Sequence, residues 1–169
     1  SFLLDRAGHH QATTIRFLCG GPIVIGEDHD VYERHIDTKK HNDYIVDGND
    51  LVKYVTDVPE FTSSSKAYSS ALIARIKSGT GVTVDIVTPE NITARTEAMY
   101  RSAAITSGVY DAYIRIGSVR TMDGSGALAA IYKIYDEVDP ASDETDQKSR
   151  DEKREVAQDQ MQVVAGIDA

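Results

Sequence analysis

Residues 81–116 read GVTVDIVTPENITARTEAMYRSAAITSGVYDAYIRI, and a strand is predicted at each end of this segment. In residues 82–87, valine and isoleucine alternate with polar residues, which is typical of a strand that buries one face. Residues 109–116 alternate in the same way, with Asp111 and Arg115 on the polar side. We therefore expect two strands here, the second of them half-buried.

A helix is predicted between these strands, over residues 89–107. Thr88 can cap this helix, Pro89 suits its first position, and Glu90 favours the positive end of the helix dipole. Gly108 follows the last turn, where glycine commonly ends a helix. Short connections between a strand, a helix and a strand indicate a crossover between parallel strands, so part of the sheet is expected to be parallel.

The residues before this unit predict a second helix and several short strands. The helix is expected over residues 68–78, before Gly79, because its apolar residues recur at helical spacing. Gly20-Gly21 lies between β-rich runs and indicates a hairpin turn. The expected strands are 14–19 and 22–25 as one pair and 31–36 and 43–46 as another, whereas residues 51–58 are ambiguous.

Residues 127–138 fit two patterns. Alternate residues from Leu128 to Ile134 would share one face of a strand. Residues three and four apart from Leu128 to Val138 would instead form the apolar stripe of a helix. Asp123-Gly124 favours a hairpin with the preceding strand, so the strand is preferred and the helix is kept as the alternative.

The last part of the chain carries most of its negative charge. The net charge is −9, of which residues 136–169 carry −7, with 11 acidic and four basic residues. We expect a single α+β domain over residues 1–140 and a charged C-terminal arm over residues 141–169, which is rich in helix formers. Such a segment buries too little apolar surface to offset its own ordering entropy. If the arm is ordered, neighbouring protein is expected to hold it.

These elements predict an α+β fold with a mixed, mostly antiparallel sheet, two principal helices and a charged C-terminal extension.

No basic stripe is present, which argues against nucleic acid as the primary ligand and against binding to an anionic membrane. The start, Ser1–Arg6, is too short and too soon charged for a signal peptide. The single cysteine, Cys19, fits a reducing compartment. We expect a product that is intracellular and soluble, or assembled into a particle.

The richest polar cluster lies between residues 27 and 41 and offers weak candidates for metal ligands. Imidazoles and carboxylates suit a divalent transition metal. The histidines are six residues apart, which matches no metal-binding motif, so a solvated hairpin is the preferred interpretation. The candidates are His29, His35, His41, Asp28 and Asp30.

No sequence motif indicates a particular reaction, so neither a catalytic residue nor a cofactor is assigned. The favoured hypothesis is a structural subunit of a ring, tube or shell, such as a connector, tail or capsid-accessory protein of a viral particle. Its partners would be further copies or neighbouring structural subunits.

The alternative is a small enzyme or a metal- or ligand-binding protein that uses residues 28–41. A third hypothesis makes the acidic arm a regulatory segment that docks on a basic partner. The residues expected at subunit contacts are Val156, Met161, Val163, Val164, Tyr110 and Tyr113.

Overall fold

The computed structural model describes residues 13–18, 41–75 and 78–168, with side chains described for residues 44–74 and 78–162. The described residues form an α+β fold with one five-stranded sheet in the order β2-β1-β3-β5-β4. The strands are β1 (Thr13–Leu18), β2 (His41–Val46), β3 (Ser69–Arg75), β4 (Val82–Ile86) and β5 (Ala112–Ser118). The helices are α3 (Gly48–Tyr54), the 3₁₀ turn η2 (Pro89–Asn91), α4 (Glu97–Thr106), α5 (Ser125–Val138) and α6 (Glu144–Asp168).

The sheet is mixed, as predicted, and its pairings divide equally between the two directions. β1 pairs with β2, and β3 with β5, in antiparallel fashion. β1 pairs with β3, and β4 with β5, in parallel. The parallel β4–β5 pair confirms the predicted crossover around the helix between them. The expected strands 22–25 and 31–36 lie outside the described residues, and β1 pairs with β2.

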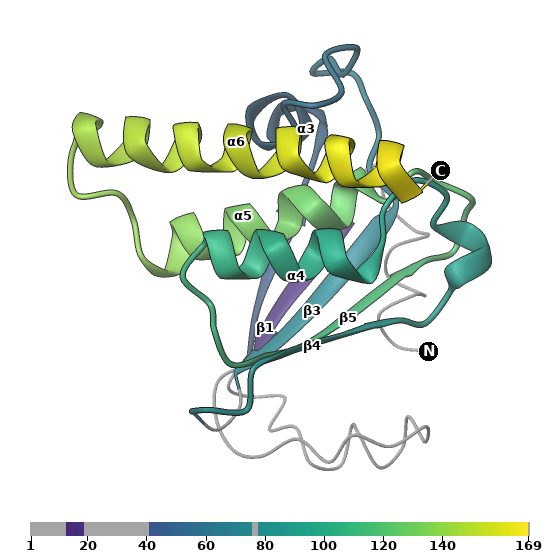
Figure 1. Ribbon diagram of the computed structural model, residues 1–169, viewed down its shortest axis with the longest axis horizontal. Helices are drawn as coiled ribbons and strands as arrows, with labels where there is room; N and C mark the ends of the chain where they lie inside the picture. The colour runs from purple at the N-terminus through teal and green to yellow at the C-terminus, as the bar shows by residue number, and fades with distance from the viewer. Residues whose placement is uncertain (1–12, 19–40, 76–77, 169) are drawn as a thin grey trace.

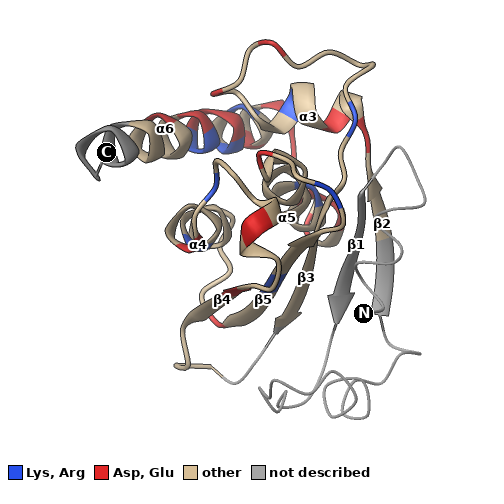
Figure 2. Ribbon diagram, turned by 90° about the vertical axis from the view of Figure 1, so that its right-hand side faces the viewer, with Lys and Arg blue, Asp and Glu red and all other residues tan. Residues whose placement is uncertain are grey.

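The helices form two further layers (Figures 1 and 2). α4 and α5 cover one face of the sheet, α3 packs beside α5, and α6 crosses over α4 and α5 as an outer layer. The core lies between the sheet and α5, whose residues from Ser125 to Tyr132 are all buried. Leu128 and Tyr132 have no exposed surface, and Ile114 of β5 is equally buried.

The helix predicted over residues 68–78 is wrong, because this segment forms β3. β3 lies in the middle of the sheet, paired on one side with β1 and on the other with β5. Its residues Ala71, Leu72, Ile73 and Ala74 are all buried, so both faces are covered. A strand that is apolar on both faces shows no alternation, and its apolar residues can also match helical spacing.

The preferred strand over residues 127–138 is also wrong, and the alternative helix is correct. Asp123-Gly124, which suggested a hairpin, instead begins α5: the backbone N–H of Ser125 donates to Asp123 Oδ1 at 2.8 Å. Gly124 has a φ of 95°, and a Cβ at this position would collide with the Tyr100 hydroxyl. Glycine is therefore required by both backbone conformation and space.

The helix predicted over residues 89–107 is shorter than expected. Pro89–Asn91 forms only the 3₁₀ turn η2, and α4 begins at Glu97 with Thr96 as its cap. Thr88 Oγ1 does not cap a helix but accepts a hydrogen bond from Ser118 N. Residues 92–96, between η2 and α4, are not helical, and a parallel bridge pairs Ile92 with Met122.

β5 was expected to be half-buried, but all seven of its residues are buried, including Arg115 at 8% exposure. The ambiguous residues 51–58 contain the second half of α3 and the loop that follows it.

Among the described residues, no helix is both long enough and apolar enough to cross a lipid bilayer.

Replacing Leu128 by alanine tests the position of the core. Leu128→Ala is expected to lower the free energy of unfolding by about 3 kcal/mol, because it leaves a cavity between α5 and the sheet. Val138→Ala, at the 41% exposed end of the same helix, is the matched control and should cost under about 0.5 kcal/mol. Urea titration of both variants measures these differences. Equal effects of the two substitutions would contradict the packing of α5 described above.

Candidate functional site

The C-terminal arm forms α6, and one polar face holds this helix on the rest of the chain. Arg150, Arg154, Gln158 and Gln162 are four residues apart in sequence, which places them on one side of a helix. Each of them donates hydrogen bonds to groups outside α6. We call this side of α6 the anchoring face.

Arg154 is bound to a carboxylate at the C-terminal end of α5. Its two terminal nitrogens lie 3.0 and 2.7 Å from the two oxygens of Asp136. Asp136 also accepts a 2.8 Å hydrogen bond from the Tyr54 hydroxyl and a 3.2 Å bond from Arg150. The Arg154 guanidinium lies over the rings of Tyr54 and Tyr132, at 5.2 and 5.3 Å from their centroids. With its side chain only 5% exposed, Arg154 depends on these partners in place of water.

Gln158 satisfies the backbone that leaves α3. It is fully buried, and its side-chain oxygen accepts hydrogen bonds from the N–H groups of Thr56 at 2.8 Å and Asp57 at 3.3 Å. Its side-chain nitrogen donates to the Tyr54 carbonyl at 2.8 Å. One amide therefore replaces three hydrogen bonds that this loop would otherwise make with water.

The Asp57–Arg95 ion pair joins the same loop to α5. The two side chains form a bidentate pair at 2.7 and 2.8 Å, and each is 2% exposed. Gln162 of α6 donates a further hydrogen bond to Asp57 at 2.7 Å. Arg95 also donates to the hydroxyl of Ser125, the first residue of α5. The anchoring face of α6 thus completes a network that reaches the start of α5.

These environments shift the pKa values of the acids and tyrosines. Burial alone would raise the pKa of Asp57 and of Asp136, but hydrogen bonds from their arginine partners and other donors outweigh it and hold both pKa values below the usual range. Burial, together with the hydrogen bond to Asp136, raises the pKa of Tyr54. Burial raises the pKa of Tyr132 to about 12. At neutral pH the two carboxylates are therefore charged and the tyrosines are neutral.

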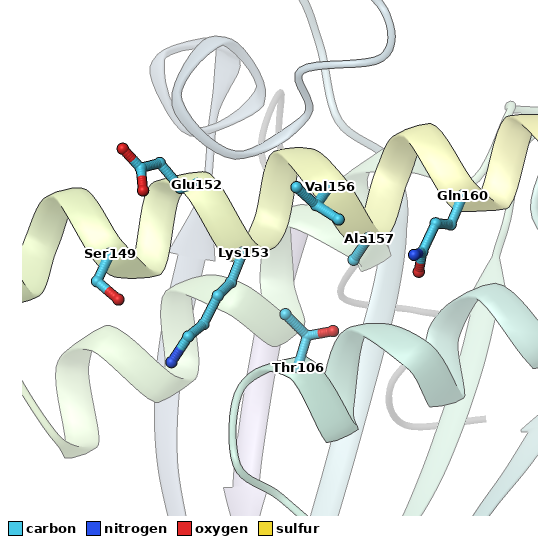
Figure 3. Close-up of a pocket in the computed structure, with 7 residues that line it drawn as sticks. All are labelled: Thr106, Ser149, Glu152, Lys153, Val156, Ala157 and Gln160. Atoms are coloured by element: carbon cyan, nitrogen blue, oxygen red, sulfur yellow. The ribbon is translucent and has the colours of Figure 1, made fainter.

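A groove lies on the other side of α6, against the end of α4 (Figure 3). Its volume is about 450 Å³, and Thr106 of α4 forms one wall. Val156 and Ala157 supply apolar surface, with Val156 55% exposed. The remaining lining residues are polar and all come from α6: Ser149, Glu152, Lys153 and Gln160. The groove therefore has an apolar centre and a charged and polar rim.

Comparison with known proteins places the chain in a family. The family described as "Protein of unknown function (DUF1002)" matches residues 30–169, which include α6. This chain belongs to that family. It is also similar to "Uncharacterized protein YpuA" of Bacillus subtilis (strain 168), with 33% identity over 86 residues. That match covers 51% of this chain and 28% of the Bacillus protein. No solved structure shows a significant match.

The residues predicted at subunit contacts have different environments in this structure. Val156 and Tyr110 are exposed, at 55% and 65%, and can contact a partner. Met161 is buried against its own chain, and Tyr113 is buried with its hydroxyl donating to Asp85 at 3.3 Å. Val163 and Val164 belong to α6, but their side chains lie outside the described residues.

The metal-ligand candidates fall largely outside the described part of the chain. His41 begins β2, and its side chain is not described. His29, His35, Asp28 and Asp30 lie in residues 19–40, outside the described residues. In the parts of the chain that the structure describes, no three His, Cys, Asp or Glu side chains are grouped as metal ligands.

Sequence reasoning missed the anchoring face. The arm was judged by its few apolar residues, whereas Arg154 and Gln158 hold it through polar contacts. The hypothesis that the acidic arm docks on a basic partner concerns another molecule and stays a prediction. At the anchoring face, α6 supplies the arginine, and the body supplies Asp136. The four-residue spacing of the anchors was the available signal.

Removing the charge of Arg154 should detach α6. Arg154→Met is expected to lower the free energy of unfolding by about 3 kcal/mol, because it leaves the Asp136 carboxylate buried without its main partner. Lys148→Met removes a cation from the same helix at a 79% exposed position and should change stability by less than about 0.5 kcal/mol. Chemical denaturation and limited proteolysis of residues 141–169 measure both effects. Equal protease resistance in the two variants would show that the polar contacts do not hold α6.

The docking of α6 should weaken in acid. The pKa of Asp136 is lower in the folded protein than in the unfolded chain, so the pair stabilises the fold above the unfolded pKa of about 3.9. This contribution is lost as the pH falls through the lower, folded-state pKa. Unfolding measured from pH 7 to pH 2 should show this loss in the wild type. Asp136→Asn should be less stable at pH 7 and should show a smaller decrease below pH 4. A decrease of the same size in both proteins would contradict this assignment.

Proposed function

We propose that this protein is a structural subunit that acts through contacts with other subunits, and that the groove side of α6 is its contact surface. The observation that carries this proposal is the exposure of Val156 beside the groove, on a helix that is otherwise firmly held. The proposal places the protein inside the cell or in an assembled particle, including the connector, tail or capsid-accessory components of viruses.

The structure supports an assembly for a different reason than the sequence does. From the sequence, a neighbouring protein was expected to hold the charged arm in place. In the structure, the chain's own residues hold α6 through its anchoring face, so no neighbour is needed for that purpose. The support now comes from the opposite side of the helix, where Val156 and, at the end of α4, Ile105 are 55% and 45% exposed.

A rigid helix is a suitable carrier for such a surface. α6 has 25 residues, which at about 1.5 Å per residue corresponds to a rod of roughly 37 Å. Because the anchoring face fixes its position, a partner need not order this helix on binding. Little conformational entropy is therefore lost, which leaves more of the contact energy for affinity.

The test is a measurement of molecular mass against concentration. The wild-type protein should show a mass above that of a single chain in light scattering, and Val156→Asp should shift this assembly to single chains because it places a charge in the apolar centre. Val138→Asp is the matched control, with a 41% exposed valine on α5, and should assemble like the wild type. The proposal is wrong if the wild type remains a single chain up to millimolar concentration. It is also wrong if both variants assemble normally.

A further inference from the structure

α6 covers a compact group of three side chains that the rest of the chain puts together. Tyr54 lies at the end of α3, and Tyr132 and Asp136 lie on α5. The two tyrosine rings pack against each other, with their centroids 6.3 Å apart, and the Tyr54 hydroxyl donates to Asp136 Oδ2 at 2.8 Å. None of these contacts involves a residue of α6, so the body of the chain builds this group without the helix.

The group has the chemistry of a binding site for a guanidinium ion. Arg154 enters it with its two terminal nitrogens 3.0 and 2.7 Å from the Asp136 oxygens and with its guanidinium over both tyrosine rings. A carboxylate matches the planar fork of arginine, and the faces of aromatic rings attract its positive charge. The ammonium group of lysine is a point charge and lacks this fork. The arrangement therefore favours arginine over lysine.

α6 contributes little to the hydrophobic core beneath it. Among the described residues, Met161 is the one member of the core cluster that comes from α6. The other buried residues of this helix are Arg154, Ala157 and Gln158, of which two are polar. α6 also lies outermost, above α4 and α5 (Figure 1). A segment with few buried apolar contacts opens at a lower free energy than the core does, so α6 can lift while the site below keeps its shape.

We propose that Tyr54, Tyr132 and Asp136 form a binding site for an arginine side chain on a helical segment of another protein chain, and that α6 closes this site by filling it with Arg154. Arg154 then acts as a built-in competitor. Its tether gives it an effective concentration in the millimolar range, so a partner needs further contacts to displace it. The site is open for only a fraction of the time, and the apparent affinity for a partner is reduced by that fraction.

Hydrogen exchange of the intact wild type tests whether α6 lifts by itself. Backbone amides near Gln158, in the middle of α6, should exchange at least about tenfold faster than those of β3 and α5, after correction for intrinsic rates, because the latter require global unfolding. Amides in the middle of the helix are chosen because the ends of any helix fray. If these amides exchange only together with those of α5, α6 does not open separately and the inference is wrong.

Small cations test the chemistry of the site in Arg154→Ala, where it is vacant. Millimolar ethylguanidinium should raise the thermal midpoint of this variant by about 2–4 °C, because a ligand that binds only the folded protein stabilises it. Ethylammonium, which has the same charge without the fork, should leave it unchanged. Neither cation should act on the wild type, whose site is filled, or on Arg154→Ala/Asp136→Asn, which lacks the carboxylate. Equal effects of the two cations on Arg154→Ala would overturn the assignment.

A helical peptide tests whether the arginine can come from another chain. The labelled probe has the sequence of residues 147–162, and its control carries Arg154→Lys. In fluorescence anisotropy, the probe should bind the Arg154→Ala protein about a hundredfold more tightly than the wild type, whose own arginine competes. The control peptide should bind at least about tenfold more weakly than the probe. Equal binding of the two peptides contradicts the inference, and so does an effect of ethylguanidinium without binding of the peptide, which would assign the site to small guanidinium compounds.

These outcomes are separate from those of the proposed function. The arginine site lies under the anchoring face of α6, whereas the proposed subunit contact lies on its groove side. Loss of assembly in Val156→Asp therefore says nothing about this site. Exchange of α6 and discrimination between the two cations do not depend on whether the wild type assembles.

Discussion

The burial of two carboxylates, Asp57 and Asp136, is the constraint on which the outer layer of this protein depends. A buried carboxylate without a partner is costly, and each of these has an arginine in bidentate contact. For Asp136 that arginine comes from α6. For Asp57 it comes from the segment before α4, with Gln162 of α6 as a further donor. α6 is therefore held in place by its hydrogen bonds and ion pairs with these two carboxylates, although it contributes few apolar contacts.

The sequence predicted strands where apolar and polar residues alternate, and it failed where apolar residues run without alternation. β4 was found from its alternation. β3 and α5 were both assigned wrongly because their apolar runs match two periodicities, and the choice depends on neighbours that the sequence does not reveal. Ser69–Arg75 is a strand because β1 and β5 flank it. Ser125–Val138 is a helix because it packs between the sheet and the helices α3 and α4.

The anchoring contacts were beyond sequence reasoning for a different reason. Arg95 and Asp57 are 38 residues apart, and Gln158 and Thr56 are 102 residues apart. A helical spacing can show that Arg150, Arg154 and Gln158 share a face, but only the tertiary fold supplies the groups they meet. Val156 was predicted to lie at a subunit contact, which stays a prediction, and the structure leaves its side chain 55% exposed.

The two sides of α6 place charges in different dielectric environments, so salt acts on them differently. The anchoring arginines are desolvated, so their attraction to Asp136 is weakly screened by salt. Lys153 and Asp159 are exposed to solvent, where salt screens interactions between charges with a Debye length of about 8 Å at physiological ionic strength. The net charge of −9 also makes copies repel one another at low ionic strength. The attachment of α6 to its own body is therefore less sensitive to salt than any contact made through the outer side of the helix.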